Sequence, residues 1–212
     1  MELKKLNDLI DIAKSKSTKR LAVAAAADKA VLQAVKSASD ENIISPVLVG
    51  KKSDIISIAK EIDFNINEEE VYDEPDPAKA SIKAVSLIKE GKAEILMKGL
   101  VSTAPLLKAV LDKENGLRKG STLSHFALIE YPYYHKLLGV TNAASNIAAE
   151  FQEKIDIINN AVEVYHGLGE DTPKVGIIRP LEVVNPKIES TCHAAMISKM
   201  NDRGQIKNCL VD

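Results

Sequence analysis

The chain has 212 residues, of which 45% are hydrophobic and only 4% aromatic, and its formal net charge is −2. This length allows one large domain or two small ones, and with so few aromatic side chains the core must be built from Ala, Val, Ile and Leu. The balanced charge excludes the basic surface of a typical nucleic-acid-binding protein, and no apolar stretch approaches the ~18 residues that a membrane span requires.

The first half of the chain alternates between helical stripes and short apolar runs. Apolar residues at helical spacing predict helices over residues 3–13, 30–38, 55–62 and 78–90, with Asp54 as the N-cap of the third. Continuous apolar runs predict buried strands over residues 21–27, 46–50 and 94–98, and a short edge strand is expected at 71–72.

The second half continues the alternation. Helices are predicted over residues 103–111, 151–165 and 188–200, and strands over 126–131, 137–141, 175–178 and 206–211. Gly167 and Gly169 are expected to end the middle helix, because glycine readily adopts the left-handed conformation found at helix C-termini.

Strands separated by helices indicate an α/β protein in which right-handed crossovers produce a mainly parallel sheet. The pattern contains about nine strands, which is many for one compact sheet at this length. Two α/β/α lobes are therefore expected, an N-terminal lobe over residues 1–125 and a second lobe over residues 126–212.

The segment Leu96–Leu111 is the strongest candidate for a functional site. A buried strand stops at Gly99 and a helix opens near Ser102 and Thr103, so backbone N–H groups, hydroxyls and the Lys98 cation are expected at one point. Such a turn can hold a phosphate or carboxylate. It is not a Walker A loop, because the lysine precedes the glycine. A structural alternative remains open, in which Ser102 or Thr103 only caps the helix and Lys98 is solvated.

Small polar residues follow a second strand, and Thr141, Asn142 and Asn146 could approach a ligand or form a capped loop. His125 precedes another strand and could bind a ligand or take part in acid–base chemistry, although a structural histidine fits the same position. Asn185 follows a later strand and is a weaker candidate. Two cysteines in the whole chain form neither a disulfide framework nor a metal-ligand pattern, which favours a reducing cytoplasmic location.

Several segments, in matching order and spacing from about Leu21 onwards, resemble the phosphate acetyl/butyryltransferase family. They are Gly91–Thr103 (GKAEILMKGLVST), Leu123–Ala127 (LSHFA), Gly139–Ile147 (GVTNAASNI), Lys154–Glu163 (KIDIINNAVE), Glu182–Lys187 (EVVNPK) and Arg203–Gln205 (RGQ). The segments Lys98–Thr103 and Val184–Lys187 are the most specific of these.

The resemblance implies two α/β/α lobes of the isocitrate/isopropylmalate-dehydrogenase kind, with the active site between them. It also implies a phosphate acyltransferase that exchanges a short acyl group, such as butyryl, between a CoA thioester and inorganic phosphate. The expected partners are CoA, acyl-CoA, acyl phosphate and phosphate, in a cytoplasmic homo-oligomer without a metal or a further cofactor. Substrate contacts would come from the following residues: Lys98, Gly99, Ser102, Thr103, His125, Thr141, Asn142, Asn146 and Asn185.

The chain also departs from the family pattern. Asn142 stands where relatives often carry Asp, and Ala149 where they often carry Pro. The Ser-Arg pair and the Asp to which the family assigns the chemical step would lie beyond residue 212, so the second lobe is expected to be incomplete and no catalytic residue is assigned. A non-catalytic CoA- or acyl-phosphate-binding fragment is therefore the alternative. A metal-dependent dehydrogenase of the same fold is a weaker one, because it requires clustered carboxylates that the spacing does not supply.

Overall fold

The computed structural model describes residues 4–120, 122–143 and 149–212. The chain divides into two units, an N-terminal unit formed by Leu9–Lys119 and a C-terminal unit formed by Gly120–Asp212 together with Met1–Asp8. Helix α1 (Leu6–Lys14) begins in the second of these and ends in the first. None of the helices in the described ranges is long and apolar enough to cross a membrane.

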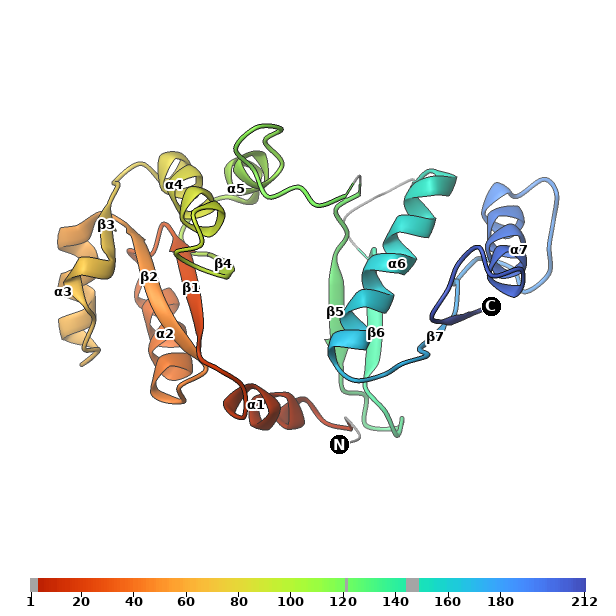
Figure 1. Cartoon of the computed structure of the whole chain (residues 1–212), viewed down its shortest axis with the longest axis horizontal. Helices are drawn as coiled ribbons and strands as arrows, with labels where there is room; N and C mark the ends of the chain where they lie inside the picture. Colours follow the sequence, from red (N-terminus) through yellow and green to blue (C-terminus); the bar gives the residue numbers. More distant parts are fainter. Residues whose placement is uncertain (1–3, 121, 144–148) are drawn as a thin grey trace. The chain divides into compact units, whose positions relative to one another are not determined.

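The N-terminal unit contains a four-stranded parallel sheet in the order β3-β2-β1-β4 (Figure 1). Its strands are β1 (Lys19–Ala24), β2 (Ile44–Gly50), β3 (Val71–Asp73) and β4 (Ile95–Lys98). They alternate with α2 (Lys29–Asp40), α3 (Lys52–Glu61), a short 3₁₀ turn (Glu68–Glu70), α4 (Pro77–Lys89) and α5 (Thr103–Val110). The chain thus moves outward from β1 to β3 and then returns to the other side of β1.

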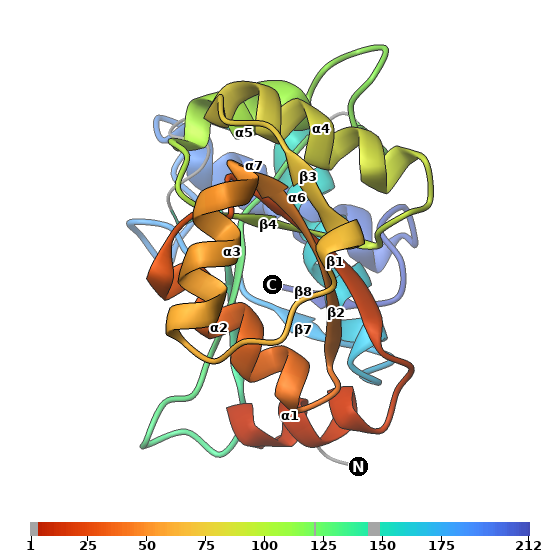
Figure 2. The same cartoon turned by 90° about the vertical axis from the view of Figure 1, so that its left-hand side faces the viewer.

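Helices cover both faces of this sheet, as Figure 2 shows from the side of this unit. On one face Val23, Leu48 and Ile55 share a core with α2 and α3. On the other face Ala22 and Ala24 of β1 pack with Ala80 and Ala84 of α4, and all four are fully buried. Small side chains on both sides let α4 approach the sheet closely. The predicted α/β/α arrangement with a mainly parallel sheet is confirmed.

Some predicted boundaries differ from the structure. The first strand ends at Ala24 rather than residue 27, because Ala25 has a left-handed φ of 56° that breaks the extended conformation. Helix α3 begins at Lys52, so Asp54 lies within its first turn and is not the N-cap. Asp54 instead pairs with Lys51 across 3.0 Å.

The C-terminal unit contains two small sheets within the described ranges. Strands β5 (Phe126–Ile129) and β6 (Leu138–Thr141) pair antiparallel, and β7 (Lys174–Val175) pairs parallel with β8 (Leu210–Val211). The helices are α6 (Phe151–Gly167) and α7 (Glu189–Asp202). The strands predicted at 175–178 and 206–211 are therefore much shorter than expected. Ile155, Ile158 and Ile197 of the two helices meet in one buried cluster.

The turn from β4 into α5 is hydrogen-bonded to the end of β1. The N–H of Gly99 donates to the carbonyl of Ala24, and the N–H of Leu100 donates to that of Ala25, both at 2.8 Å. A Cβ atom at position 99 would lie 2.3 Å from the Ala25 oxygen and 2.6 Å from the Ala24 oxygen. Only glycine fits at this position, because both obstructing atoms belong to the backbone.

We expect Gly99→Ala to lower the free energy of unfolding by about 1–3 kcal/mol, because the new methyl group must push two strand ends apart. Urea denaturation followed by circular dichroism measures the change. Gly176→Ala is the control, since nothing lies within 4 Å of a Cβ at that position. If the two variants unfold at the same urea concentration, the close approach at Gly99 is not a constraint.

Candidate functional site

The predicted anion site lies at the point where the strand order of the N-terminal sheet reverses. Strands β2 and β3 lie on one side of β1 and β4 lies on the other, and α2, which follows β1, packs on the opposite face from α5, which follows β4. The loops after β1 and β4 therefore diverge at the carboxyl edge of the sheet. In open α/β sheets this switch point is the usual place for a ligand.

Three backbone donors are available at the start of α5. Ser102 is the N-cap residue, but its side chain makes no capping hydrogen bond. Within the described part of the chain, the N–H groups of Ser102, Thr103 and Ala104 have no hydrogen-bond partner. Ser102 and Thr103 are both exposed, so their hydroxyls are accessible to solvent. Free N–H groups and the positive end of the helix dipole together favour an anion.

Lys98 lies beside these donors and is held in place by the turn itself. Its Nζ donates to the carbonyl oxygens of Val101, at 2.8 Å, and Gly99, at 3.5 Å. The Lys98 side chain is exposed, and these two bonds restrain it against its own turn. Because carbonyl oxygens carry no formal charge, its ammonium group still contributes a full positive charge beside the start of α5.

Asp28 follows β1 at the same edge, and its carboxylate caps α2 by accepting the N–H of Val31 at 2.9 Å. This negative charge is thus partly satisfied by a helix N-terminus, where carboxylates are stabilised. Helices α2 and α5 both begin near the β1–β4 switch point. The N-terminus of α2 has a side-chain cap, from Asp28, whereas the N-terminus of α5 has none.

Three further predicted residues meet in the C-terminal unit. The carbonyl of His125 accepts the hydroxyl of Thr141 at 2.7 Å and the N–H of Asn142 at 3.3 Å. Asn142 has a left-handed φ of 59°, a conformation that asparagine tolerates better than most residues. His125 itself is exposed, so its ring is not used as a buried structural group.

The remaining predicted residues stand apart from these groups. Asn185 lies in the turn before α7, where its Oδ1 accepts the N–H of Lys187 at 3.0 Å and its carbonyl accepts the Thr191 hydroxyl at 2.9 Å. Its side chain thus shapes the turn. Asn146 lies outside the described residues. Lys98, Gly99, Ser102 and Thr103 belong to the N-terminal unit, and His125, Thr141, Asn142 and Asn185 belong to the C-terminal unit.

A row of polar residues on α6, missed in the sequence, positions the segment that carries His125. Nδ2 of Asn160 donates to the Thr122 carbonyl at 3.1 Å and to Ser124 Oγ at 3.0 Å. Asp156 accepts the hydroxyl of Thr122 at 2.8 Å and an amide hydrogen of Gln152 at 3.2 Å. Gln152, Asp156 and Asn160 recur every four residues, so the signal was a polar stripe on a largely apolar helix.

Tyr165, on the same helix, contacts strands β5 and β6. Its Oη accepts the N–H of Gly139 at 2.7 Å, and its ring meets Phe126 edge to face with centroids 5.8 Å apart. Burial raises the pKa of Tyr165, while the Gly139 bond acts in the opposite direction. The Tyr165 phenol thus stays protonated at neutral pH.

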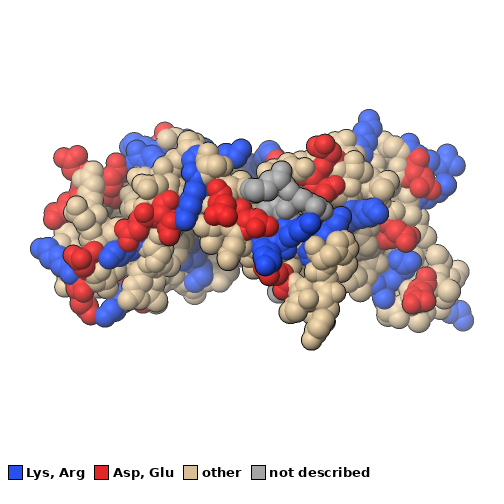
Figure 3. Space-filling view, turned by 90° about the horizontal axis from the view of Figure 1, so that it is seen from below, with Lys and Arg blue, Asp and Glu red and all other residues tan. Residues whose placement is uncertain are grey.

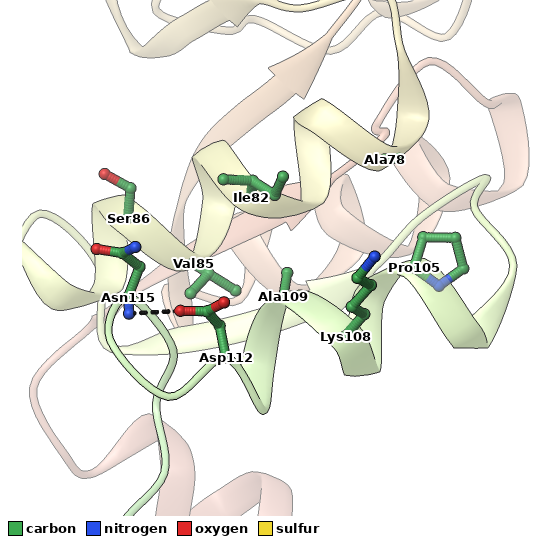
Figure 4. Close-up of a pocket in the computed structure, with 9 residues that line it drawn as sticks. All are labelled: Ala78, Ile82, Val85, Ser86, Pro105, Lys108, Ala109, Asp112 and Asn115. Atoms are coloured by element: carbon green, nitrogen blue, oxygen red, sulfur yellow. Dashed lines mark hydrogen bonds between the residues drawn. The ribbon is translucent and has the colours of Figure 1, made fainter.

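A cavity of about 420 Å³ lies elsewhere in the N-terminal unit, between α4 and α5 (Figure 4). Its lining is largely apolar and includes Ile82, Val85 and Ala109. Asp112 at its rim accepts the N–H groups of Asn115, at 2.7 Å, and Glu114, at 3.0 Å, and these bonds lower the pKa of its carboxyl group. No predicted site residue lines this cavity.

Charge and metal-ligand geometry add two further observations. On the face shown in Figure 3, acidic and basic side chains lie side by side, as the balanced composition predicts. Across the described ranges, no group of three or more His, Cys, Asp or Glu side chains could hold a metal ion.

Comparisons with known proteins agree with the geometry. A family profile described as "Phosphate acetyl/butaryl transferase" matches residues 76–212. The chain is 49% identical over 210 residues to a phosphate butyryltransferase of Clostridium acetobutylicum, covering 99% of this chain and 70% of the relative. It is 39% identical over 207 residues to a phosphate acetyltransferase of Thermotoga maritima, covering 98% of this chain and 70% of that relative.

Solved structures show the same fold. A branched-chain phosphotransacylase from Enterococcus faecalis matches with a TM-score of 0.74 and 29% identity, over 92% of this chain and 67% of that one. A phosphotransacetylase from Streptococcus pyogenes matches with a TM-score of 0.74 and 15% identity, over 98% of this chain and 73% of that one. At this lower identity the likeness concerns the fold alone.

We expect Asn160→Ala to lower the free energy of unfolding by about 1–2 kcal/mol, because the Thr122 carbonyl and the Ser124 hydroxyl lose their part-buried donor. Asn159→Ala is the matched control, since Asn159 is its exposed neighbour on the same helix. Urea denaturation of both variants tests the difference. Equal losses would mean that the Asn160 amide does not hold the His125 segment.

Proposed function

Because the chain belongs to the phosphate acetyl/butyryl transferase family, we propose that it exchanges a short acyl group, such as butyryl, between a CoA thioester and inorganic phosphate. The resemblance inferred from the sequence motifs is confirmed by the family match. The observation that carries the proposal is the set of free N–H donors at the start of α5, beside the Lys98 ammonium.

The proposed substrates share one chemical property that this site can use. Inorganic phosphate, acyl phosphate and the phosphate groups of CoA are all anions. The N–H groups of Ser102, Thr103 and Ala104 point from a helix N-terminus, and such donors bind phosphate oxygens without requiring a metal. We therefore propose that the phosphate of the acyl phosphate occupies this position.

In the proposed reaction the CoA thiol loses its proton to a base, and the resulting thiolate attacks the acyl carbonyl carbon. A carbon–sulfur bond forms, the carbon–oxygen bond to phosphate breaks, and phosphate leaves with the electron pair. The donors at α5 and the Lys98 charge would stabilise the negative charge that grows on the departing phosphate. We assign no general base to this chain.

The second group of residues is proposed to contact the same substrates. His125 and Asn142 contribute an imidazole and an amide, and the His125 carbonyl accepts both the Asn142 N–H and the Thr141 hydroxyl, which joins the three residues through the backbone. These are neutral or titratable polar groups, suited to bind an acyl carbonyl or an amide of CoA.

Three further parts of the proposal follow from the family and from the thiols. The enzyme is proposed to act as a homo-oligomer and to need no cofactor apart from CoA as a substrate. A cytoplasmic location is also proposed. It is supported by Cys192 and Cys209, both of which are free thiols, as expected in a reducing compartment.

The test is the rate of butyryl-CoA formation from butyryl phosphate and CoA by the 212-residue chain. We expect Lys98→Met to lower kcat/KM by roughly 10- to 100-fold, because a charged hydrogen-bonding group contributes about 1.5–3 kcal/mol. Lys60→Met is the control, because Lys60 is an exposed lysine on α3.

Calorimetric titration with CoA and with phosphate separates the outcomes. Turnover that falls in Lys98→Met but not in Lys60→Met supports the exchange reaction. Binding of CoA without turnover would contradict exchange by this chain and would support the ligand-binding alternative. A melting temperature for each variant shows whether a loss reflects the site or the fold.

A further inference from the structure

The cavity between α4 and α5 takes no part in the proposed reaction, yet it has the properties of a small-molecule site. Its volume of about 420 Å³ falls within the range of ligand pockets, which combine an apolar lining with a few polar groups. Val85 and Ala109 line it and are themselves buried, whereas Ile82 is 58% exposed. An aliphatic group in the cavity would contact the first two side chains and cover the third.

Two side chains of opposite charge line the same cavity. Lys108 lies in the last turn of α5, and Asp112 follows that helix. Figure 4 shows Lys108 toward the end of the cavity that Pro105 marks, and Asp112 toward the other end, beside Asn115. Among the residues that the structure describes, Lys108 has neither Asp112 nor any other partner for its ammonium group. Each end of the cavity thus offers one charge to a ligand.

Asp112 is oriented to accept a further hydrogen bond. Its Oδ1 already accepts the N–H groups of Glu114 and Asn115, and these two bonds fix the direction of the carboxylate. Its Oδ2 has no hydrogen-bond partner in the described part of the chain. The ammonium group of Lys108 has three donors and no acceptor. One end of the cavity therefore accepts hydrogen bonds and the other donates them.

This pair of charges discriminates among small apolar ligands. A simple carboxylate would be attracted by Lys108 and repelled by Asp112, and a simple amine would experience the reverse. An α-amino acid carries an ammonium group, a carboxylate and a side chain on one carbon atom, so it satisfies both ends at once. An aliphatic side chain then matches the apolar lining between them.

We propose that the cavity between α4 and α5 binds a free aliphatic α-amino acid, such as leucine. The carboxylate of the amino acid accepts from the Lys108 ammonium, and its own ammonium donates to Oδ2 of Asp112. The aliphatic side chain packs on Val85 and Ala109 and covers Ile82. The bound molecule would bridge α4 and α5 without occupying the N-terminus of α5.

Titration of the isotope-labelled 212-residue chain with leucine, followed by NMR, tests the site directly. We expect the amide signals of α4 and α5 to shift, with a dissociation constant on the order of 1 mM for so small a ligand. Shorter side chains should bind more weakly, by about fourfold for each CH₂ group removed. Isocaproate, which is leucine without its ammonium group, and isoamylamine, which is leucine without its carboxylate, should each bind about two- to fivefold more weakly.

Two variants assign each charge to its partner. In Asp112→Asn, which keeps an Oδ1 acceptor for the turn, leucine should lose its advantage over isocaproate and keep its advantage over isoamylamine. In Lys108→Met the pattern should be reversed. Lys113→Met is the matched control, because Lys113 is an exposed lysine next to Asp112 that does not line the cavity. A dispersed amide spectrum establishes that each variant is folded.

Three results would overturn the proposal. The first is the absence of shifts in α4 and α5 at ten times the expected dissociation constant. The second is equal affinity of the unmodified chain for leucine, isocaproate and isoamylamine, which would mean that the two charges select nothing. The third is the same order of affinities in Lys108→Met as in Lys113→Met. Because only binding is measured, none of these outcomes depends on acyltransferase activity.

Discussion

The backbone contact between the ends of β1 and β4 is the constraint on which the N-terminal unit depends. Two hydrogen bonds, from Gly99 to Ala24 and from Leu100 to Ala25, bring the turn before α5 onto the carboxyl end of the central strand. Such proximity requires a residue without a side chain at position 99. It also requires β1 to stop at Ala24, and the left-handed Ala25 provides that stop. The start of α5 is therefore held against the switch point of the sheet.

The many alanine residues also permit a close approach, here between a whole helix and the sheet. With so few aromatic residues, the sheet and α4 meet through Ala22, Ala24, Ala80 and Ala84, which leave little space between helix and strand. Close-packed interiors tolerate small changes in volume poorly. Helix α4 is thereby held close to the sheet, and α5, which begins beside the donors at Ser102 and Thr103, packs in the same buried cluster through Leu106. Precise placement of donors is what an anion site needs.

Periodicity was enough to predict the order of the elements, the parallel sheet and the turn after β4, because those features follow from local patterns. It was not enough to predict where strands end. Residues 25–27 are as apolar as the strand before them, and only the contact with the β4 turn shows why the backbone turns at Ala25. Residues 206–209 likewise include apolar side chains that are buried for other reasons: Ile206 and Cys209 pack in the cluster around α6 and α7 without joining a strand.

The candidate site likewise contains residues that local sequence patterns predict and residues that they do not. Lys98, Ser102 and Thr103 were found because a strand, a glycine and a helix start are adjacent in the sequence, whereas the role of Asn160 depends on a contact 36 to 38 residues away. Long-range contacts of this kind produce only a weak pattern in the sequence, here a polar residue at every fourth position on α6. His125 illustrates both local sequence information and long-range contacts. Its residue type suggested a role, but it is the antiparallel pairing of β5 with β6 that brings it beside Thr141 and Asn142, and the polar stripe on α6 that keeps it there.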